Sequence, residues 1–176
     1  MQRHWNAAKR ILIYLMHSKD LALALSNHSD DGFPAYSDAT WADDPAIRRS
    51  RSGRALFYHG SLLSAWSHPQ RSVSLSSTEA EYQSMATCIQ ESELNIRAND
   101  PTPLFCDNQG ALALTKNHPK NKHISIKFNF IRDSVKDGLV KLHYISTDSQ
   151  IADVSTKPLA FPKFSRFRDM LQFHSK

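Results

Sequence analysis

The chain has 176 residues, which suits one domain with a short appendage, and 40% of its residues are hydrophobic, enough for a normal core. A net charge of +5 and a pI of about 9.3 favour an anionic partner such as nucleic acid. Two cysteines without metal-ligand spacing exclude a disulfide framework, and the sequence holds neither a membrane-spanning apolar run nor a secretory signal. We therefore expect an intracellular protein without a membrane partner.

The amino-terminal part of the chain predicts a helix followed by strands. Apolar residues recur at helical spacing over residues 5–17, and leucines that alternate with alanines predict a strand over 21–25. The polar, turn-rich stretch 26–32 indicates a boundary or linker. Residues 33–38 then predict a short strand that ends at an aspartate.

A hairpin and a long helix are expected next. Two strand-like runs, 53–59 and 62–66, flank the turn His59-Gly60-Ser61. Ser77 or Thr78 can cap a helix that runs to about Asn95.

The second half of the chain alternates short strands with helices. We expect a strand over 104–106, helices over 108–115 and 123–136, and a strand over 139–146. Thr147 or Asp148 is expected to cap a last core helix. Beyond it, Phe161, Phe164, Phe167 and Leu171 form an apolar stripe on a terminal helix that needs a packing partner. This order predicts an α/β fold whose mixed sheet contains an antiparallel hairpin and two strands reached by helical crossovers.

Four acidic residues stand out in this framework. Asp38 and Asp107 end apolar runs that predict strands, whereas Glu81 and Asp153 lie near the starts of predicted helices. A carboxylate in an apolar setting is costly unless a positive charge shares it. The convergence of all four would therefore indicate divalent metal. For any single acid taken alone, a surface charge or a helix cap is the simpler explanation.

A family resemblance rests on six stretches taken in order: residues 36–42, 49–53, 75–82, 106–111, 122–124 and 151–159. They resemble the ribonuclease H domain that follows the reverse transcriptase in copia-type retrotransposon polyproteins. The resemblance extends from about residue 2 to residue 173. It departs from the family pattern between Glu91 and Pro101, where a shorter, polar stretch is expected to shorten the central helix and expose its core face.

The resemblance implies a ribonuclease H-like fold, a five-stranded mixed sheet with helices on both faces. It assigns Asp38, Glu81, Asp107 and Asp153 as catalytic residues that bind two Mg²⁺ ions, with Mn²⁺ as a substitute. Glu79 is the rival for the second position, but the two glutamates cannot face one site because they lie about 200° apart around a helix. Glu81 is favoured because the family pattern places its glutamate just before a large apolar residue that packs inward, and Tyr82 follows Glu81.

The resemblance also implies a domain order and a reaction. Residues 1–30 would be a remnant of the reverse transcriptase thumb or connection, 31–160 the ribonuclease H domain, and 161–176 a helical tail. Two metal ions about 3.5–4 Å apart can promote phosphodiester hydrolysis, and Mg²⁺ prefers carboxylate oxygens. The expected substrate is the RNA strand of an RNA–DNA hybrid, and the reverse transcriptase of the same polyprotein is the expected partner. The expected location is the cytoplasm, in a virus-like particle, with a nuclear phase left open.

Several residues beside the acids are candidates for nucleic-acid contact. Ser76, Ser77, Asn108 and Gln109 could contact sugars or phosphates, although helix capping explains the serines equally well. Lys122, His123, Lys127 and Arg132 could line a phosphate path, with a solvated helix face as the alternative. A structural hydrogen bond is the simpler role for His123.

Two other functions compete with a nuclease. The chain could be a catalytically silent retrotransposon-derived remnant, or a nucleic-acid-binding module that keeps the fold and the basic surface. A transposase or integrase of related fold is a third candidate, but such enzymes use three acids with a widely spaced final glutamate. The motif around Asp153 argues against that class.

Overall fold

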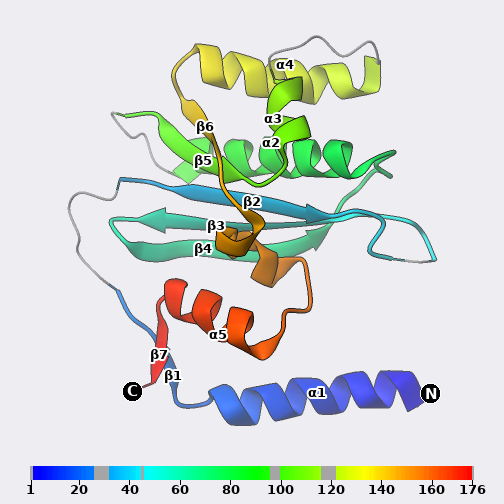
Figure 1. The fold of residues 1–176 in the computed structure, drawn as a ribbon, viewed down its shortest axis with the longest axis vertical. Helices are drawn as coiled ribbons and strands as arrows, with labels where there is room; N and C mark the ends of the chain where they lie inside the picture. Colours follow the sequence, from blue (N-terminus) through cyan, green and yellow to red (C-terminus); the bar gives the residue numbers. More distant parts are fainter. Residues whose placement is uncertain (1, 26–31, 45, 96–99, 116–121, 176) are drawn as a thin grey trace.

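A five-stranded mixed sheet forms the centre of the computed structural model, which describes residues 2–25, 32–44, 46–95, 100–115 and 122–175 (Figure 1). The elements follow one another as α1 Gln2–Ser18, β1 Leu21–Leu23, β2 Ala35–Thr40, β3 Arg51–Tyr58, β4 Ser61–Pro69, α2 Ser77–Asn95, β5 Thr102–Cys106, α3 Gln109–Leu114, α4 Lys122–Lys136, β6 Val140–Tyr144, the 3₁₀ helices η1 Thr147–Ser149 and η2 Ile151–Ser155, α5 Phe161–Met170 and β7 Phe173–Ser175.

The order of strands across the sheet is β4-β3-β2-β5-β6. β2, β3 and β4 are antiparallel neighbours, whereas β5 runs parallel to β2, and β6 runs parallel to β5. Helices cover both faces, with α2, α3 and α4 on one side and η2 and α5 on the other (Figure 1). The predicted α/β fold with its antiparallel hairpin and parallel crossover strands is confirmed.

The turn between β3 and β4 lies where the sequence predicts a hairpin. His59 and Gly60 have positive φ values of 47° and 75°. Consecutive positive φ values are typical of the tight turns that join antiparallel strands, and glycine adopts them at no steric cost.

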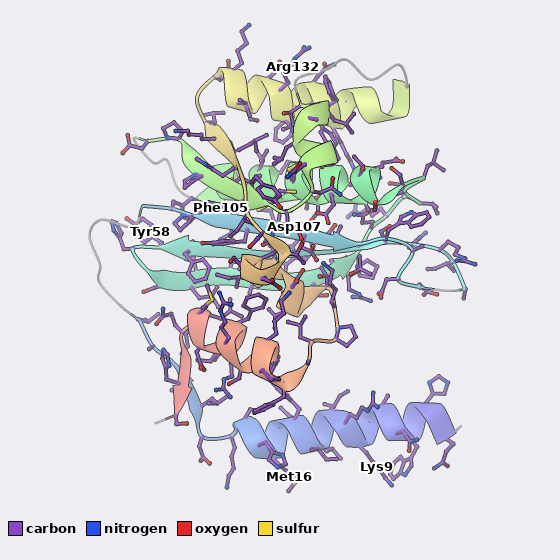
Figure 2. All side chains as sticks on the ribbon, in the orientation of Figure 1. Lys9, Met16, Tyr58, Phe105, Asp107 and Arg132 are labelled. Atoms are coloured by element: carbon purple, nitrogen blue, oxygen red, sulfur yellow. The ribbon has the colours of Figure 1, made fainter. Side chains whose placement is uncertain are left out.

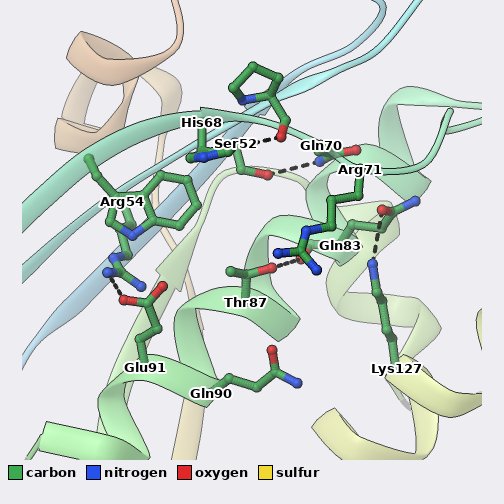
Figure 3. A pocket seen from close by; sticks show the side chains of 12 residues that line it. Ser52, Arg54, His68, Gln70, Arg71, Gln83, Thr87, Gln90, Glu91 and Lys127 are labelled. Atoms are coloured by element: carbon green, nitrogen blue, oxygen red, sulfur yellow. Dashed lines mark hydrogen bonds and ion pairs between the residues drawn. The ribbon is translucent and has the colours of Figure 1, made fainter.

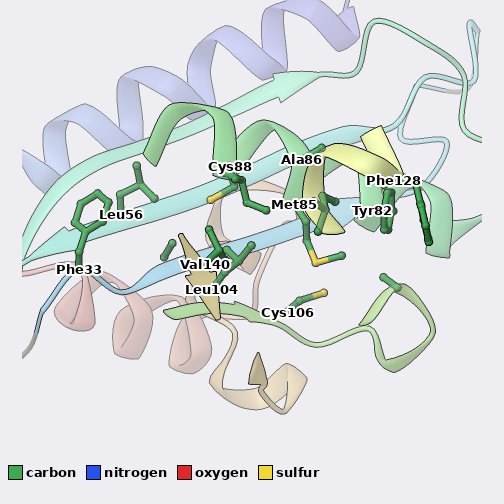
Figure 4. Packing of buried hydrophobic residues seen from close by; sticks show 14 residues of the cluster. Phe33, Leu56, Tyr82, Met85, Ala86, Cys88, Leu104, Cys106, Phe128 and Val140 are labelled. Atoms are coloured by element: carbon green, nitrogen blue, oxygen red, sulfur yellow. The ribbon is translucent and has the colours of Figure 1, made fainter. Parts of the chain in front are cut away.

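Alternation along β3 separates two hydrophobic cores. Leu56 faces α2 and packs in a buried cluster with residues such as Met85 and Leu104 (Figure 4). Its neighbours Ala55 and Phe57 point to the opposite face and pack in a second cluster. Successive side chains of a strand point to opposite faces, so β3 contributes side chains to the cores on both faces of the sheet.

The terminal helix α5 finds its packing partner in this second cluster. Phe167 and Leu171 are buried, and the cluster that holds Leu171 also contains Leu62 of β4 and Ile151 of η2. Phe161 remains exposed. Part of the predicted apolar stripe is therefore core and part is surface.

The two ends of the described chain meet in a small second sheet. β1 pairs antiparallel with β7, with Leu21 opposite Ser175. The ring of Tyr14 in α1 makes an edge contact with Phe164 of α5, at 6.4 Å between centroids. The predicted domain boundaries at 30/31 and 160/161 stay a prediction, and the two outer segments contact each other.

Two expectations about helix starts are wrong. Ser76, rather than Ser77 or Thr78, caps α2, because its hydroxyl accepts the backbone N–H of Glu79 at 3.1 Å. The last core helix is not an α-helix that Thr147 or Asp148 caps but the short 3₁₀ helix η2. Its cap is Gln150, whose side-chain oxygen accepts the N–H of Ala152.

The helix η2 is short for two reasons. The amide of Gln150 donates to the carbonyl of Ser37 at 3.0 Å, which fixes the start. Pro158 follows soon after Ser155, and a proline disfavours helical backbone at the residue before it.

Up to Ser92, the last described side chain of α2, the central helix does not show the expected exposure of its core face. α2 runs to Asn95, the predicted end, and its core-facing Ile89 and Ser92 are buried.

Candidate metal centre

Four elements bring the predicted acids to one edge of the sheet. Asp38 comes from β2, Glu81 from the first turns of α2, Asp107 from the residue after β5, and Asp153 from η2. Asp38, Glu81 and Asp153 are 0%, 5% and 1% exposed, while Asp107 is half-buried. Figure 2 shows Asp107 between the end of β5 and the 3₁₀ turns.

The acids form two overlapping groups. One carboxylate oxygen each from Asp38, Asp107 and Asp153 lie within 4.8 Å of one another. Ligand atoms of Glu81, Cys106 and Asp107 satisfy the same limit. Asp107 belongs to both groups, so it is the residue that joins all four acids into one cluster.

The fold explains why the two strand acids meet. β2 and β5 are parallel neighbours, so their carboxyl ends lie at the same edge of the sheet. Asp153 reaches them because η2 packs closely on β3 at Gly53, the residue opposite Asp38 in the sheet register. A Cβ at Gly53 would lie 2.6 Å from Cγ2 of Thr156, which no real Cβ contact allows. The absence of a side chain at this position therefore lets the fourth acid approach.

The choice between Glu79 and Glu81 follows from their surroundings. The carboxylate of Glu79 accepts the backbone N–H of Leu75 at 2.7 Å and a hydrogen bond from the side chain of Gln83. These contacts stabilise the start of α2. Glu81 points inward to the cluster, and its Oε2 is buried without a hydrogen-bond partner among the described residues.

Two lysines lie against the acids. Nζ of Lys157 is 3.1 Å from Oδ1 of Asp38 and 2.6 Å from Oδ1 of Asp153. Nζ of Lys163, on α5, is 2.8 Å from the other oxygen of Asp153. These ammonium groups neutralise part of a cluster that would otherwise repel itself.

Hydroxyl groups complete the contacts of the cluster. Thr156 donates a hydrogen bond to Oδ2 of Asp38. Thr147, on η1, donates to Oδ2 of Asp107 at 2.7 Å. Sequence reasoning did not assign these threonines or the two lysines to the acidic site. The available signal was the spacing of four residues between Asp153 and Lys157, which suits an ion pair on a helix.

Burial and crowding of like charges perturb the acids. Burial, followed by repulsion from Asp38 and Asp107, raises the pKa of Glu81 to about 9. Burial raises the pKa of Asp38 as well, against the attraction of Lys157. Burial alone would lower the pKa of Lys157. The hydrogen bond to Asp153 and the attraction of Asp38 outweigh burial and hold this pKa above the ordinary value.

The arrangement fits a divalent cation. Carboxylate oxygens are the ligands that Mg²⁺ and Mn²⁺ prefer, and the cluster offers four carboxylates within a short span. The orphaned Oε2 of Glu81 is a buried acceptor that a cation would satisfy.

Two of the four candidate nucleic-acid residues next to the acids cap helices. Ser76 caps α2, and Asn108 caps α3 by accepting the N–H of Ala111 at 2.9 Å. Ser77 and Gln109 are exposed beside them. Contact of these four residues with nucleic acid stays a prediction.

The basic candidates on α4 are placed in part. Lys127 donates to Oε1 of Gln83 on α2 at 3.0 Å, and the guanidinium of Arg132 lies 5.8 Å from the ring centre of Phe128. Lys122 and His123 belong to the first turn of α4, and their side chains lie outside the described residues.

A cavity of about 660 Å³ lies away from the acids, between β3, β4 and α2 (Figure 3). Arg54 forms an ion pair with Glu91 there, and its guanidinium stacks 4.6 Å from the ring centre of Trp66. Arg71 and Lys127 add positive charge to the lining. The cavity shares Lys127 with the predicted phosphate path.

Comparison with known proteins identifies the relatives of the chain. It is 39% identical over 177 residues to the retrovirus-related Pol polyprotein from transposon RE2 of Arabidopsis thaliana, which covers 93% of this chain. It is 33% identical over 185 residues to the Pol polyprotein from transposon TNT 1-94 of Nicotiana tabacum, which covers 99%. The chain is homologous to copia-type retrotransposon Pol polyproteins. No family model matches it.

The chain corresponds to a small part of these Pol relatives. It spans 12% of the length of the RE2 polyprotein and 14% of the TNT 1-94 polyprotein.

Solved structures confirm the fold. The foamy viral protease-reverse transcriptase in complex with RNA/DNA hybrid matches with a TM-score of 0.57 and 13% identity, over 82% of this chain and 21% of that one. LC11-RNase H1 in complex with RNA/DNA hybrid matches with a TM-score of 0.55 and 13% identity, over 70% of this chain and 92% of that one. The ribonuclease H-like fold is therefore confirmed.

Among the described helices, none combines the length and apolar character needed to span a bilayer.

Proposed function

We propose that this chain is a ribonuclease H that hydrolyses the RNA strand of RNA–DNA hybrids during retrotransposon reverse transcription, with two bound Mg²⁺ ions. The observation that carries the proposal is the convergence of Asp38, Glu81, Asp107 and Asp153 on one edge of the sheet. The Pol homology and the RNA/DNA hybrids named with two structural relatives support the choice of substrate.

Each of the four acids would serve as a ligand of one or both Mg²⁺ ions. Asp38 and Asp107 would contact both ions, Glu81 would complete one site and Asp153 the other. When bound, such a pair of ions activates water, neutralises charge at phosphorus and stabilises the leaving 3′ oxygen.

Two threonines and a lysine contact these acids and influence how they bind metal. Thr147 and Thr156 orient the carboxylates of Asp107 and Asp38 through hydrogen bonds, which limits their motion. Lys157 neutralises Asp38 and Asp153 in the metal-free protein and therefore competes with a cation for them. Positive groups on α4, such as Lys127, would bind the phosphates of the hybrid.

The proposal extends to the setting of the reaction. The reverse transcriptase of the same polyprotein would deliver the hybrid. The cytoplasmic virus-like particle, with a nuclear phase left open, would be its location.

Cleavage of a labelled RNA–DNA hybrid with Mg²⁺ tests the proposal. We expect the wild-type chain to cleave the RNA strand and to leave single-stranded RNA and the DNA strand intact. Asp107→Asn should lower the rate by at least about 100-fold, because it weakens both cation positions. Asp148→Asn, an exposed acid on η1, is the matched control and should cleave normally. Equal cleavage by wild type and Asp107→Asn would refute the assignment.

The alternative is a catalytically silent, retrotransposon-derived nucleic-acid-binding module. The shortened, polar stretch between Glu91 and Pro101, where the chain departs from the family pattern, is the feature that favours binding without turnover. A folded wild-type chain that binds the hybrid but does not cleave it would support this alternative.

A further inference from the structure

A buried thiol lies at the inner side of the acidic cluster. Cys106 ends β5, directly before Asp107, and its side chain lies in the hydrophobic core cluster (Figure 4). Its Sγ lies within 4.8 Å of ligand atoms of Glu81 and Asp107. The backbone N–H of Asn108 approaches the same sulfur at 3.4 Å.

A second observation points to a ligand at this place. Oε2 of Glu81 is fully buried and has no hydrogen-bond partner among the described residues. A buried carboxylate oxygen without a donor is costly, and native structures rarely leave one unsatisfied. A cation between Glu81, Cys106 and Asp107 would satisfy it.

The chemistry of the donors selects the class of cation. We propose that Cys106, Glu81 and Asp107 form a metal site for a thiophilic divalent ion of the Zn²⁺ or Cd²⁺ class. Zinc accepts cysteine sulfur together with carboxylate oxygen, and three protein ligands leave a fourth position to water. Mg²⁺ prefers hard oxygen ligands and gains nothing from sulfur. When the ion binds, the sulfur–metal bond replaces the S–H bond, and the proton passes to solvent.

The other group of acids lacks a sulfur ligand for such an ion. Asp38, Asp107 and Asp153 offer oxygen ligands alone, and Lys157 and Lys163 already lie against two of them. The thiol therefore decides where a soft ion binds.

The site has a consequence for the proposed reaction. Glu81 and Asp107 also belong to the Mg²⁺ centre of the proposed nuclease, so a soft ion held by Cys106 would displace Mg²⁺ and inhibit hybrid cleavage. This inhibition rests on the proposed function, whereas binding of the soft ion does not.

Titration of the metal-free full chain with Cd²⁺ tests the site, without nucleic acid. Ultraviolet absorbance reports the thiolate-to-cadmium charge-transfer band, which carboxylates and Mg²⁺ do not give. We expect one Cd²⁺ per chain and loss of the band in Cys106→Ser. Cys88→Ser is the matched control and should keep the band, because Cys88 belongs to no metal-ligating group of the described residues.

A second variant keeps the thiol and tests the carboxylates. Glu81→Gln should weaken Cd²⁺ binding at least about tenfold. Circular dichroism confirms the fold of each variant before titration, and Glu81→Gln decides the question if Cys106→Ser does not fold. A band that persists in folded Cys106→Ser, or an affinity that Glu81→Gln leaves unchanged, would overturn the three-ligand site.

Zn²⁺ inhibition of hybrid cleavage forms the second arm of the test. Each protein is compared with its own uninhibited rate, and Cys106→Ser should need at least about tenfold more Zn²⁺. Cleavage that Zn²⁺ does not inhibit, in a chain that binds Cd²⁺ through Cys106, would overturn the shared ligands. Absence of any cleavage would reject the proposed function and leave the Cd²⁺ result decisive for the site.

Discussion

Nζ of Lys157 lies 3.1 Å from Oδ1 of Asp38, although 119 positions separate the two residues in the sequence. The same ammonium group also contacts Asp153 at 2.6 Å. An internal cation thus joins two of the acids that we assign to Mg²⁺. The cluster can therefore fold before metal arrives, because part of its negative charge is already balanced.

Replacement of this lysine should separate stability from metal affinity. Lys157→Met removes the charge that balances Asp38 and Asp153, so the metal-free protein should lose about 2 kcal/mol of unfolding free energy. This is below the 3–5 kcal/mol of a fully buried pair, because the lysine side chain is 34% exposed. Mg²⁺ should bind more tightly, because it no longer competes with the ammonium group. Thermal unfolding with and without Mg²⁺ measures both effects.

The control for this experiment is Lys141→Met, which removes an exposed lysine on β6. It should change neither quantity. If Lys157→Met weakened Mg²⁺ binding as well as stability, Lys157 would be a support of the metal centre and not its competitor.

A methyl group at Gly53 should disturb the fourth acid. Gly53→Ala would place Cβ 2.6 Å from Cγ2 of Thr156 and 2.8 Å from Cβ of Ser155. The strand and η2 must then move apart, with an expected cost of about 1–3 kcal/mol. Mg²⁺ affinity should fall with it, because Asp153 moves away from Asp38. Calorimetric binding and chemical denaturation measure these changes.

Partial rescue provides the control for the glycine variant. The additional change Thr156→Ser removes the methyl group that makes the shortest contact. It should recover part of the stability lost in Gly53→Ala. Unchanged stability in Gly53→Ala would show that η2 does not depend on this close approach.

Stability of the metal-free protein should fall as pH rises. The pKa of Glu81 is about 9 in the folded chain against an ordinary value of 4.5. Between these values the folded state binds more protons than the unfolded state, so stability decreases with rising pH in this window. The raised pKa of Asp38 acts in the same direction. Thermal unfolding from pH 5 to pH 9 measures the trend.

Glu81→Gln removes the group responsible for most of this trend. Its melting temperature should vary less with pH than that of the wild type in the same buffers. An equal pH dependence in both proteins would assign the effect to other groups.

Binding of nucleic acid should not require the metal cluster. The variant Asp107→Asn should still bind an RNA–DNA hybrid, with an affinity that falls steeply as salt rises. Lys127→Met should reduce the slope of log affinity against log salt by about 1, because one phosphate contact is lost. Lys141→Met should leave the slope unchanged. A flat salt response would refute the phosphate path on α4.

Much of the fold follows from local sequence patterns. The hairpin turn at His59 and Gly60, and the end of α4 just before Gly138, are signalled by residues whose backbone preferences are specific. The pairing of β1 with β7 could not be predicted, because short terminal strands carry no signal for a partner 150 positions away.

The site could be predicted in part. The meeting of Asp38 and Asp107 was expected from the family resemblance, and the parallel strands β2 and β5 explain it, because their carboxyl ends share an edge of the sheet. Lys163 comes from a separate helix, and its contact with Asp153 depends on tertiary packing. The 3₁₀ form of η2 was missed because the hydrogen bond from Gln150 to Ser37 joins distant parts of the chain.

Calorimetric titration with Mg²⁺ of the wild type and Asp107→Asn tests the central claim most directly. Asp107 is the acid shared by both groups of ligands. We expect the wild type to bind Mg²⁺ and Asp107→Asn to weaken this binding at least about tenfold, while Asp148→Asn does not. Equal Mg²⁺ affinity of wild type and Asp107→Asn would contradict the assignment of the four acids as one metal centre.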